Sequence, residues 1–422
     1  MNNCKESLKR IAGASLLATT LALALSGCGS ASSTGEETVE AVTAEQSSTS
    51  TEDTSSSVTV ANLTTDGAID TTDLFTERDL TQVADTSDAT ALTLASGKDL
   101  QITEEGVYVI SGEATDATIT VNADDNAKVQ LVLNGASITN ADFPAIYVVN
   151  ADKVFVTTVA GTTNTLQVTG SFVADGDTNT DAVIFSKDDL TLNGQGSLVI
   201  SSTANGITSK DDLKVTGGSY DITSAADAFE ANESIAVADG SFTINSSKDG
   251  LHAEDSDNDA TGHIYICGGS FDINAASDGL QATTVLQIDG GTIRMNAGEA
   301  LEATYVQVNG GDLDIAATDD GINASTKSSS VGTPTIEITG GSVSIDMGSG
   351  DTDAIDANGN LIISGGEIDI TAQFAFDFDG SVSFTGGTVT VNGETVTEIT
   401  NSMMMGGGMG QPGGGMGGGP RG

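Results

Sequence analysis

The chain has 422 residues, with 60 acidic and 14 basic side chains, a formal net charge of -46 at pH 7 and no tryptophan. Such a charge argues against nucleic acid and anionic lipid as partners, because both would be repelled. It suits cations, or neutral partners bridged by cations. High charge can indicate disorder, but a regular apolar pattern across residues 105–400 argues against disorder there.

Residues 1–27 have the features of a bacterial export signal. Basic residues precede an apolar run from Ile11 to Leu25, which is shorter than the roughly 20 residues of a membrane span. The run ends in Leu-Ser-Gly-Cys at residues 25–28, which resembles a lipobox. We predict lipidation of Cys28 and a location on the extracellular face of the cell membrane. The alternative is an ordinary signal peptide followed by a chance cysteine.

The segments that flank the repetitive region differ from it in composition. Residues 28–65 are rich in Ser, Thr and Glu without an apolar period, and we interpret them as a disordered spacer. Residues 66–104 are a transitional segment and N-terminal cap. Residues 401–422 are rich in Gly and Met, cannot bury a core, and are predicted to be a disordered tail.

Glycine pairs recur between these ends, at a basic spacing of 20–22 residues with longer gaps where the chain has insertions. In the turn around Gly290-Gly291, Leu286/Ile288 alternate before the pair and Ile293/Met295 after it. Period-two alternation indicates strands with one buried face, and the glycines permit positive φ at the corner between them. A third apolar piece completes each period.

Three short strands and three corners in about 21 residues form one rung of a right-handed parallel β-helix. We therefore predict an all-β solenoid of about 13 rungs over residues 105–400, whose stacked rungs share one core. An antiparallel sandwich is the alternative fold. It would require alternate units to differ, whereas each unit here repeats the same order of elements.

Acidic residues recur beside the third apolar piece, in strings such as Asp249-Gly-Leu-His252 and Glu299-Ala-Leu-Glu302. Stacked rungs would place these side chains about 5 Å apart. Carboxylates that close repel one another unless cations or hydrogen-bond donors lie between them. Calcium takes six to eight oxygen ligands and suits such a site. The alternative is that these side chains only bond the turn backbone.

Three places concentrate these acids: an insertion at 254–259, neighbouring turns over 299–323, and the stretch 351–356. The predicted calcium ligands are Asp249, Glu254, Asp255, Asp257, Asp259, Glu299, Glu302, Asp319, Asp320, Asn323, Asp351, Asp353 and Asp356. The insertion has acids at alternate positions, as calcium loops do. It lacks the glycine and the distal glutamate of an EF-hand, so that motif is excluded.

A second predicted surface is the outward column of residues that follows each glycine pair. Asp272, Arg294 and Asp314 are its candidate ligand-binding residues. Arg294 either balances the flanking acids or binds a carboxylate of the ligand.

Four strings carry a family resemblance: Gly-Val-Tyr-Val-Ile-Ser-Gly at 106–112, Leu-Val-Leu-Asn-Gly at 131–135, Asp-Asp-Gly-Ile-Asn-Ala-Ser at 319–325 and Asp-Ala-Ile-Asp-Ala-Asn-Gly at 353–359. Over residues 105–395 the chain resembles a bacterial carbohydrate-binding domain family. The resemblance implies a fold similar to that of pectate lyases, and binding of calcium and of plant polysaccharides such as polygalacturonate and cellulose. Ala300 and Ala354 depart from the glycine expected in the acidic turn.

We therefore predict calcium-dependent, non-catalytic binding of acidic plant cell-wall polysaccharide by a monomer at the cell surface. One alternative is a pectin lyase that uses calcium and an Arg or Lys base. The candidate bases, Arg294, Lys248, Lys210 and Lys327, lie in no string that resembles a lyase active site. The other alternative is a structural surface protein or adhesin without a sugar ligand, which the scarcity of aromatic residues would fit.

Overall fold

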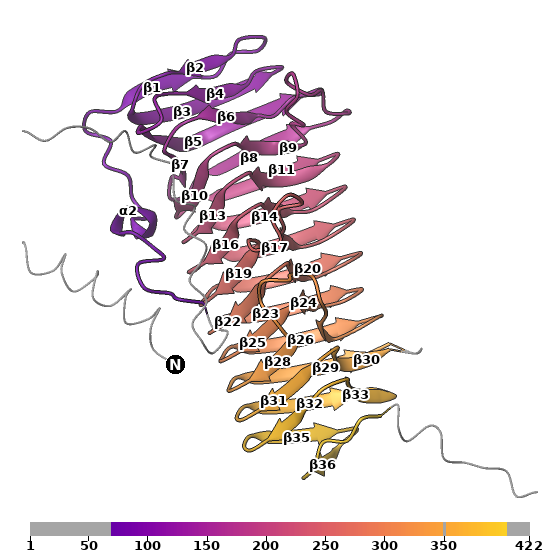
Figure 1. Cartoon of the computed structure of the whole chain (residues 1–422). Coiled ribbons are helices and arrows are strands. Elements are labelled where there is room, and N and C mark those ends of the chain that lie inside the picture. Colours follow the sequence, from indigo (N-terminus) through magenta and orange to yellow (C-terminus); the bar gives the residue numbers. More distant parts are fainter. Residues whose placement is uncertain (1–68, 349–351, 403–422) are drawn as a thin grey trace, which may run out of the picture. The chain divides into compact units, whose positions relative to one another are not determined.

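A computed structural model describes residues 69–348 and 352–402. Their strands form two sheets, of 24 and 12 strands. The strands of the larger sheet fall into two columns and those of the smaller sheet into a third, and most turns of the chain supply one strand to each column (Figure 1). We call this arrangement the stack.

The strands of the three columns have the following bounds. The first column contains β1 (Thr90–Thr93), β3 (Gly106–Thr115), β5 (Lys128–Asn140), β7 (Lys153–Thr158), β10 (Asp189–Gly194), β13 (Asp212–Val215), β16 (Ser234–Val237), β19 (His263–Ile266), β22 (Val285–Ile288), β25 (Tyr305–Val308), β28 (Thr335–Ile338), β31 (Asn360–Ile363) and β34 (Val382–Phe384). The second column shares the long strands β3 and β5 and continues with β8 (Thr163–Val168), β11 (Ser197–Ser202), β14 (Ser219–Ser224), β17 (Ser241–Ser246), β20 (Ser270–Ala275), β23 (Thr292–Ala297), β26 (Asp312–Ala317), β29 (Ser342–Met347), β32 (Glu367–Thr371), β35 (Thr388–Val391) and β36 (Glu394–Val396). The third column contains β2 (Leu100–Ile102), β4 (Ile119–Asn122), β6 (Ile146–Asn150), β9 (Ala182–Ser186), β12 (Asn205–Ser209), β15 (Phe229–Ala231), β18 (Leu251–Ala253), β21 (Leu280–Ala282), β24 (Leu301–Ala303), β27 (Ile322–Ala324), β30 (Asp353–Ala357) and β33 (Phe374–Phe378).

Strands within a column pair in parallel, as β13 does with β16 and β14 with β17. Among the paired strands of the described residues, only β35 and β36 run antiparallel. The chain is therefore all-β with long parallel sheets, compatible with the predicted parallel β-helix and not with an antiparallel sandwich. Its right-handed sense and its count of about 13 rungs stay predictions.

The core lies between the three columns and follows from the alternation in the sequence. In β23, Ile293 and Met295 are buried while Thr292, Arg294 and Asn296 are exposed. Because pairing is in register, side chains of one kind meet in successive turns. The rings of Phe242 and Phe271 stack with centroids 4.4 Å apart.

The glycine pairs have two separate structural causes, as Gly340-Gly341 shows. A Cβ on Gly340 would lie 2.5 Å from the carbonyl oxygen of Asn309 in the preceding turn, closer than atoms can approach. Gly341 has φ +87°, a conformation that side-chain-bearing residues rarely adopt. The first glycine therefore allows close stacking of two turns, and the second allows the corner.

Residues 69–84, which we call the strap, lie along the outer side of the first column and include the short helix α2 (Glu77–Leu80) (Figure 1). Thr76 caps this helix through a reciprocal contact with Asp79. The backbone N–H of Ile69 donates to Gln287 of β22, and Gln82 donates to the carbonyl oxygen of Thr216 after β13. One short segment thus contacts several successive turns.

The strap is fixed by a buried ion pair. The Asp79 carboxylate has no exposed surface, and it lies 2.9 Å from Nζ of Lys153 in β7, whose side chain is 9% exposed. Thr191 of β10 donates a further hydrogen bond to the same carboxylate. Part of the segment 66–104, which was predicted to be a transitional N-terminal cap, therefore binds the side of the stack.

In the part of the chain that the structure describes, no helix is long and apolar enough to cross a membrane. The predicted signal peptide, Cys28, the spacer and the tail from residue 403 lie outside the described residues.

We expect Lys153→Met to lower the free energy of unfolding by about 3–5 kcal/mol, because Asp79 would be left as a buried charge without its partner. The matched control is Lys128→Met. Lys128 is the register partner of Lys153, but its ion pair with Asp152 is exposed (49% and 43%), so its loss should cost less than about 1 kcal/mol. Urea unfolding measures both values, and equal losses would contradict the role assigned to the strap.

Candidate functional site

The recurring acids of the sequence form two adjacent columns along the third column of strands. The turn column lies at the first residue of a strand or in the turn just before it, and it contains Asn205, Asp227, Asp249, Asp278, Glu299, Asp320 and Asp353. The strand column lies at the middle of the paired strands and contains Thr208, Glu230, His252, Gln281, Glu302, Asn323, Asp356 and Asp377. Parallel pairing in register brings these side chains together from residues 21 to 33 positions apart in the chain.

The turn column has a structural role. The Asp227 carboxylate accepts the backbone N–H of Asp249 at 2.9 Å, and the Asp249 carboxylate accepts the N–H of Asp278 at 2.9 Å. Asp320 accepts the N–H of Asp353 in the same way, at 3.2 Å. These contacts tie one turn of the chain to the next. In each case the hydrogen bond involves one oxygen of the carboxylate, so the second oxygen remains for another ligand.

One group of oxygen ligands is the Asn323 cluster, which we define as Asp278, Glu299, Glu302 and Asn323. One oxygen from each of the three carboxylates lies within 4.8 Å of the others. Nδ2 of Asn323 donates to Glu299 at 2.9 Å. Asn323 is only 8% exposed, and its buried Oδ1 has no hydrogen-bond partner. A buried acceptor without a donor is costly, and a cation would satisfy it.

Electrostatics in the Asn323 cluster are unfavourable without a cation. Burial, followed by the repulsion from neighbouring carboxylates, raises the pKa of Asp278 to about 7. Burial also raises the pKa of Glu299 to about 7, although Asn323 donates to it. Lys327, whose Nζ lies 2.7 Å from Glu302, neutralises part of the charge. One lysine facing three carboxylates leaves a net negative site made only of oxygen ligands, which fits a hard cation such as calcium.

The other predicted ligands between residues 319 and 356 are not part of the Asn323 cluster. Asp320 and Asp356 belong to the two polar columns of the next turns, and burial followed by neighbouring carboxylates raises the pKa of Asp356 to about 7. Asp353 occupies the turn column beside Asp320. Asp319 is exposed. Asp351 lies outside the described residues.

The insertion at 254–259 does not bring its acids together. Asp255 accepts the backbone N–H of Asp257 within the loop, and Asp259 accepts hydrogen bonds from the N–H and hydroxyl of Ser329. Glu254 turns back toward His252, with 3.2 Å between Oε2 and Nε2. No metal-compatible group in the described residues contains two acids of this loop.

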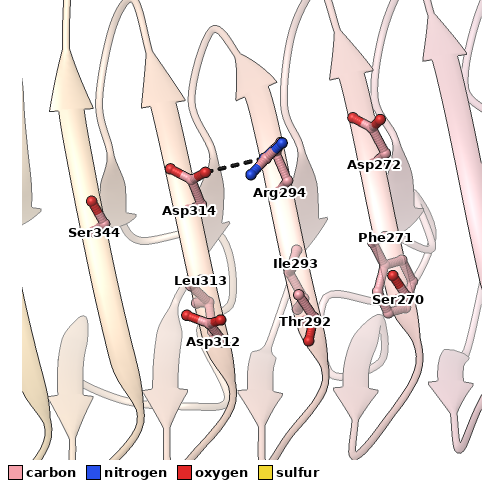
Figure 2. A pocket seen from close by; sticks show the side chains of 10 residues that line it. All are labelled: Ser270, Phe271, Asp272, Thr292, Ile293, Arg294, Asp312, Leu313, Asp314 and Ser344. Atoms are coloured by element: carbon pink, nitrogen blue, oxygen red, sulfur yellow. Dashed lines mark hydrogen bonds and ion pairs between the residues drawn. The ribbon is translucent and has the colours of Figure 1, made fainter.

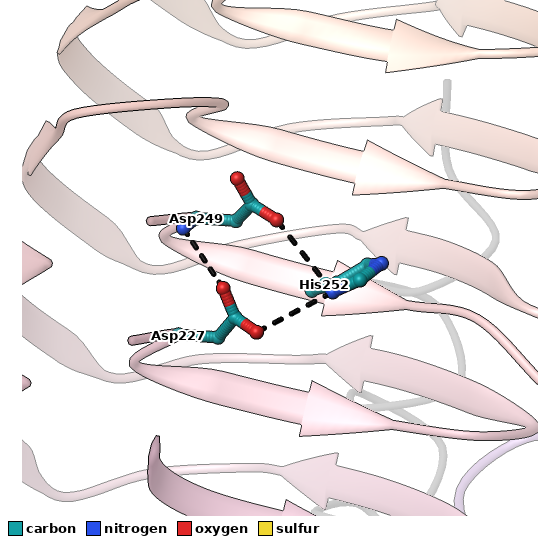
Figure 3. Close-up of side chains that lie close together, drawn as sticks. All are labelled: Asp227, Asp249 and His252. Atoms are coloured by element: carbon teal, nitrogen blue, oxygen red, sulfur yellow. Dashed lines mark hydrogen bonds and ion pairs between the residues drawn. The ribbon is translucent and has the colours of Figure 1, made fainter. Parts of the chain in front are cut away.

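Asp249 belongs to a different group, in which it lies beside Asp227 and His252 (Figure 3). Burial lowers the pKa of His252, but the carboxylates of Asp227, Asp249 and Glu254 outweigh it and raise the pKa to about 9. The neighbouring carboxylates are therefore partly neutralised by the protein's own imidazolium.

The candidate ligand-binding residues Asp272, Arg294 and Asp314 lie side by side on the exposed face of β20, β23 and β26, where they line an open pocket of about 530 Å³ (Figure 2). Nε of Arg294 lies 3.1 Å from Asp314, and the two side chains are 71% and 59% exposed. An ion pair so exposed contributes little to stability, so Arg294 can exchange Asp314 for another carboxylate.

The predicted ligands do not include Asp227 and Asp278, although both occupy the repeated position of the acidic strings that could have identified them. They also do not include the cluster of Asp211, Asp212 and Glu233, which lies at another corner of the stack, where Lys214 is 3.7 Å from Asp212. Its only sequence signal is acids at the same place in two successive turns.

The chain is similar to known proteins over most of the stack. The family model described as carbohydrate-binding domain-containing protein matches residues 96–304 and 299–395. A protein of that description from Acetivibrio thermocellus is 35% identical over 127 residues, which are 29% of this chain and 44% of the relative, so less than half of the relative's length is spanned. A solved structure, the gadolinium derivative of a polysaccharide lyase-like protein from C. thermocellum, is 24% identical and covers 72% of this chain and 94% of its own, with a TM-score of 0.32.

The raised pKa values of Asp278 and Glu299 predict how stability depends on pH without calcium. Unfolded carboxyls titrate near pH 4, so the contribution of these groups is fully present below about pH 4 and is lost as pH rises through about 7. We expect the urea concentration at half-unfolding, measured in EGTA, to decrease as the pH is raised from 5 to 8. The double variant Asp278→Asn/Glu299→Gln should flatten this slope.

The matched control is Asp255→Asn, which removes a half-buried charge outside the cluster and should keep the wild-type slope. A double variant with an unchanged slope would show that the Asn323 cluster is not the source of the pH dependence.

Proposed function

Because the chain belongs to the family of carbohydrate-binding domain-containing proteins, we propose that it binds acidic plant cell-wall polysaccharide through calcium, without catalysis. Polygalacturonate is the primary candidate ligand and cellulose the second. The binding body is the stack, as a right-handed parallel β-helix. The Leu-Ser-Gly-Cys string at residues 25–28 supports a lipid anchor on Cys28, which would hold the protein at the outer face of the cell membrane.

The observation that carries the calcium requirement is the Asn323 cluster. Three carboxylates with oxygens within 4.8 Å and a buried amide oxygen without a partner form a ligand set of oxygen alone. Glu299, Glu302, Asp278 and Asn323 would hold the ion. Calcium completes its six to eight ligands with water or with oxygens of a bound molecule.

The charge of the chain explains why a cation would be needed for an acidic glycan. At a net charge of -46 the protein repels uronate carboxylates at long range. A calcium ion held by protein carboxylates can also accept oxygens from the glycan. It therefore converts a repulsive contact into a bridge between two anionic partners.

The pocket around Arg294 provides a second contact that does not require metal. Arg294 lies between Asp272 and Asp314 on neighbouring strands, and its guanidinium is largely exposed. Carboxylates bind guanidinium groups in a paired, charge-assisted geometry. A uronate carboxylate could therefore replace Asp314 as the partner of Arg294, while the small polar residues of the same face contact sugar hydroxyls.

We expect the full chain to be retained on immobilised polygalacturonate with calcium and released by excess EGTA. Asp278→Asn/Glu299→Gln should lose most of the calcium-dependent retention, at least about tenfold, because it removes two of the three clustered charges. Asp255→Asn is the control with unchanged retention. Absorbance of unsaturated products is followed in the same samples.

Retention with no product would support non-catalytic binding. Product formation would show a lyase instead. Equal retention of wild type and double variant would contradict the proposed calcium site, and absence of retention in either buffer would favour a structural surface protein.

We expect Arg294→Gln to weaken retention on polygalacturonate by roughly threefold to tenfold. This loss corresponds to about 1 kcal/mol of binding free energy, because the variant lacks one exposed charge-assisted contact. Its retention on neutral cellulose should not change, because no carboxylate is available there. The control is Lys128→Gln, which removes one exposed positive charge elsewhere on the stack. A similar loss for both variants would mean that Arg294 acts only through net charge.

A further inference from the structure

His252 faces carboxylates with both of its ring nitrogens, and Figure 3 shows the two carboxylates near Nδ1. Its Nδ1 lies 3.5 Å from Oδ2 of Asp227 and 3.5 Å from Oδ2 of Asp249, and its Nε2 lies 3.2 Å from Oε2 of Glu254. The side chains of Asp227 and Asp249 are 4% exposed and that of His252 is 16% exposed. Imidazole and carboxylate groups converge here in a largely buried place.

The separations at Nδ1 are long for hydrogen bonds. Charge-assisted N–H···O contacts measure about 2.7–2.9 Å, so neither of these contacts is a short charge-assisted hydrogen bond. A tetrahedral zinc ion has bonds of about 2.0–2.2 Å, which place its ligand atoms about 3.3–3.6 Å apart. The two equal distances of 3.5 Å therefore match the ligand spacing around such an ion.

The groups around these three atoms are arranged as in the outer shell of a metal site. The Oδ1 atoms of Asp227 and Asp249 accept the backbone N–H groups of Asp249 and Asp278, each at 2.9 Å, which leaves both Oδ2 atoms directed at Nδ1. Glu254 accepts from Nε2. Histidines that bind metal through one nitrogen almost always donate the other N–H to a carboxylate or carbonyl, which fixes the ring.

We propose that Asp227, Asp249 and His252 form a zinc site in which Oδ2, Oδ2 and Nδ1 are the three protein ligands. The fourth tetrahedral position is left to water or to an oxygen of a bound molecule. Binding replaces the proton on Nδ1, which is released to solvent, and the charge of the ion balances the two carboxylates. Glu254 is a positioning residue that orients the imidazole.

This site differs in chemistry from the Asn323 cluster, although both lie on the same polar columns. An imidazole nitrogen favours borderline ions such as zinc, whereas calcium prefers oxygen ligands alone. The position of His252 is occupied by Gln281 in the next turn and by Glu302 in the turn after that. A single substitution in the strand column therefore changes which metal a turn can select.

Lys248 is the competing cation. Its Nζ lies 3.3 Å from Oδ2 of Asp227, the oxygen assigned to the ion. The Lys248 side chain is 56% exposed, so it can turn into solvent when the ion binds. Lys248 therefore does not prevent the ion from binding to Asp227.

The test is a zinc titration of the full chain at millimolar calcium, followed by NMR with labelled histidine. The chain has only 2 histidines, so the ring signals of His252 can be compared with those of His263. His263 is 8% exposed and lies outside the three metal-compatible groups of the described residues. We expect one zinc equivalent to shift the signals of His252 and to leave those of His263 unchanged.

His252→Gln should reduce zinc affinity by at least about tenfold. Loss of a residue that only contacts a metal ligand already reduces metal affinity by about this factor. Glutamine already occupies this position in the next turn as Gln281, so the fold should persist, which urea unfolding checks. Glu254→Gln should weaken zinc binding less, and Asp255→Asn, an acid of the same loop outside the cluster, should leave it unchanged.

Zinc affinity of His252→Gln equal to that of wild type would overturn the proposal, as would displacement of zinc by equimolar calcium or a shift of both histidines. Retention on polygalacturonate with calcium is measured on the same variant. Retention should remain at the wild-type level. The two measurements therefore test the zinc site and the proposed carbohydrate binding separately.

Discussion

Parallel pairing between successive turns, in register, is the constraint on which the rest of the structure depends. It separates equivalent backbone positions by about 4.8 Å and repeats that spacing for the length of the stack. Apolar residues of one position therefore meet in a continuous core, and Phe242 lies directly on Phe271. A Cβ at Gly340 would collide with the preceding turn, so the same spacing also selects glycine at the corners.

The same register makes carboxylates neighbours, which is unfavourable. Two unit charges about 5 Å apart repel by about 3 kcal/mol at an effective dielectric constant of 20. Backbone N–H groups satisfy one oxygen of Asp227 and Asp249. Protein cations neutralise others, as Lys327 does for Glu302. Where neither suffices, as around Asn323, raised pKa values and an unpartnered amide oxygen remain. The metal binding that we propose would compensate the remaining charge, and it would connect the electrostatics of this fold with its proposed function.

Much of the candidate site could be predicted because it repeats. The position shared by Glu302, Asn323 and Asp356 was evident from the strings, and the structure pairs these residues in register. The outward column likewise predicted that Asp272, Arg294 and Asp314 are neighbours. The acids of the insertion at 254–259 are not repeated in the other long insertion, residues 325–334. The alternating acids at 254–259 resembled a calcium loop, but the loop directs Asp259 to Ser329 and Glu254 to His252.

The sequence by itself determined the repeat, the alternation that buries one face of each strand, the corner glycines and the recurrence of acids beside the third apolar piece. These properties are local and periodic, so each turn gives the same information again. Only the tertiary structure decided that the strap reaches Lys153 through Asp79, and that His252 faces Asp227 in the preceding turn. Such contacts join residues far apart in the chain or depend on side-chain direction at a single turn. No period in the sequence records them, because they arise when neighbouring turns and the segment before them pack together.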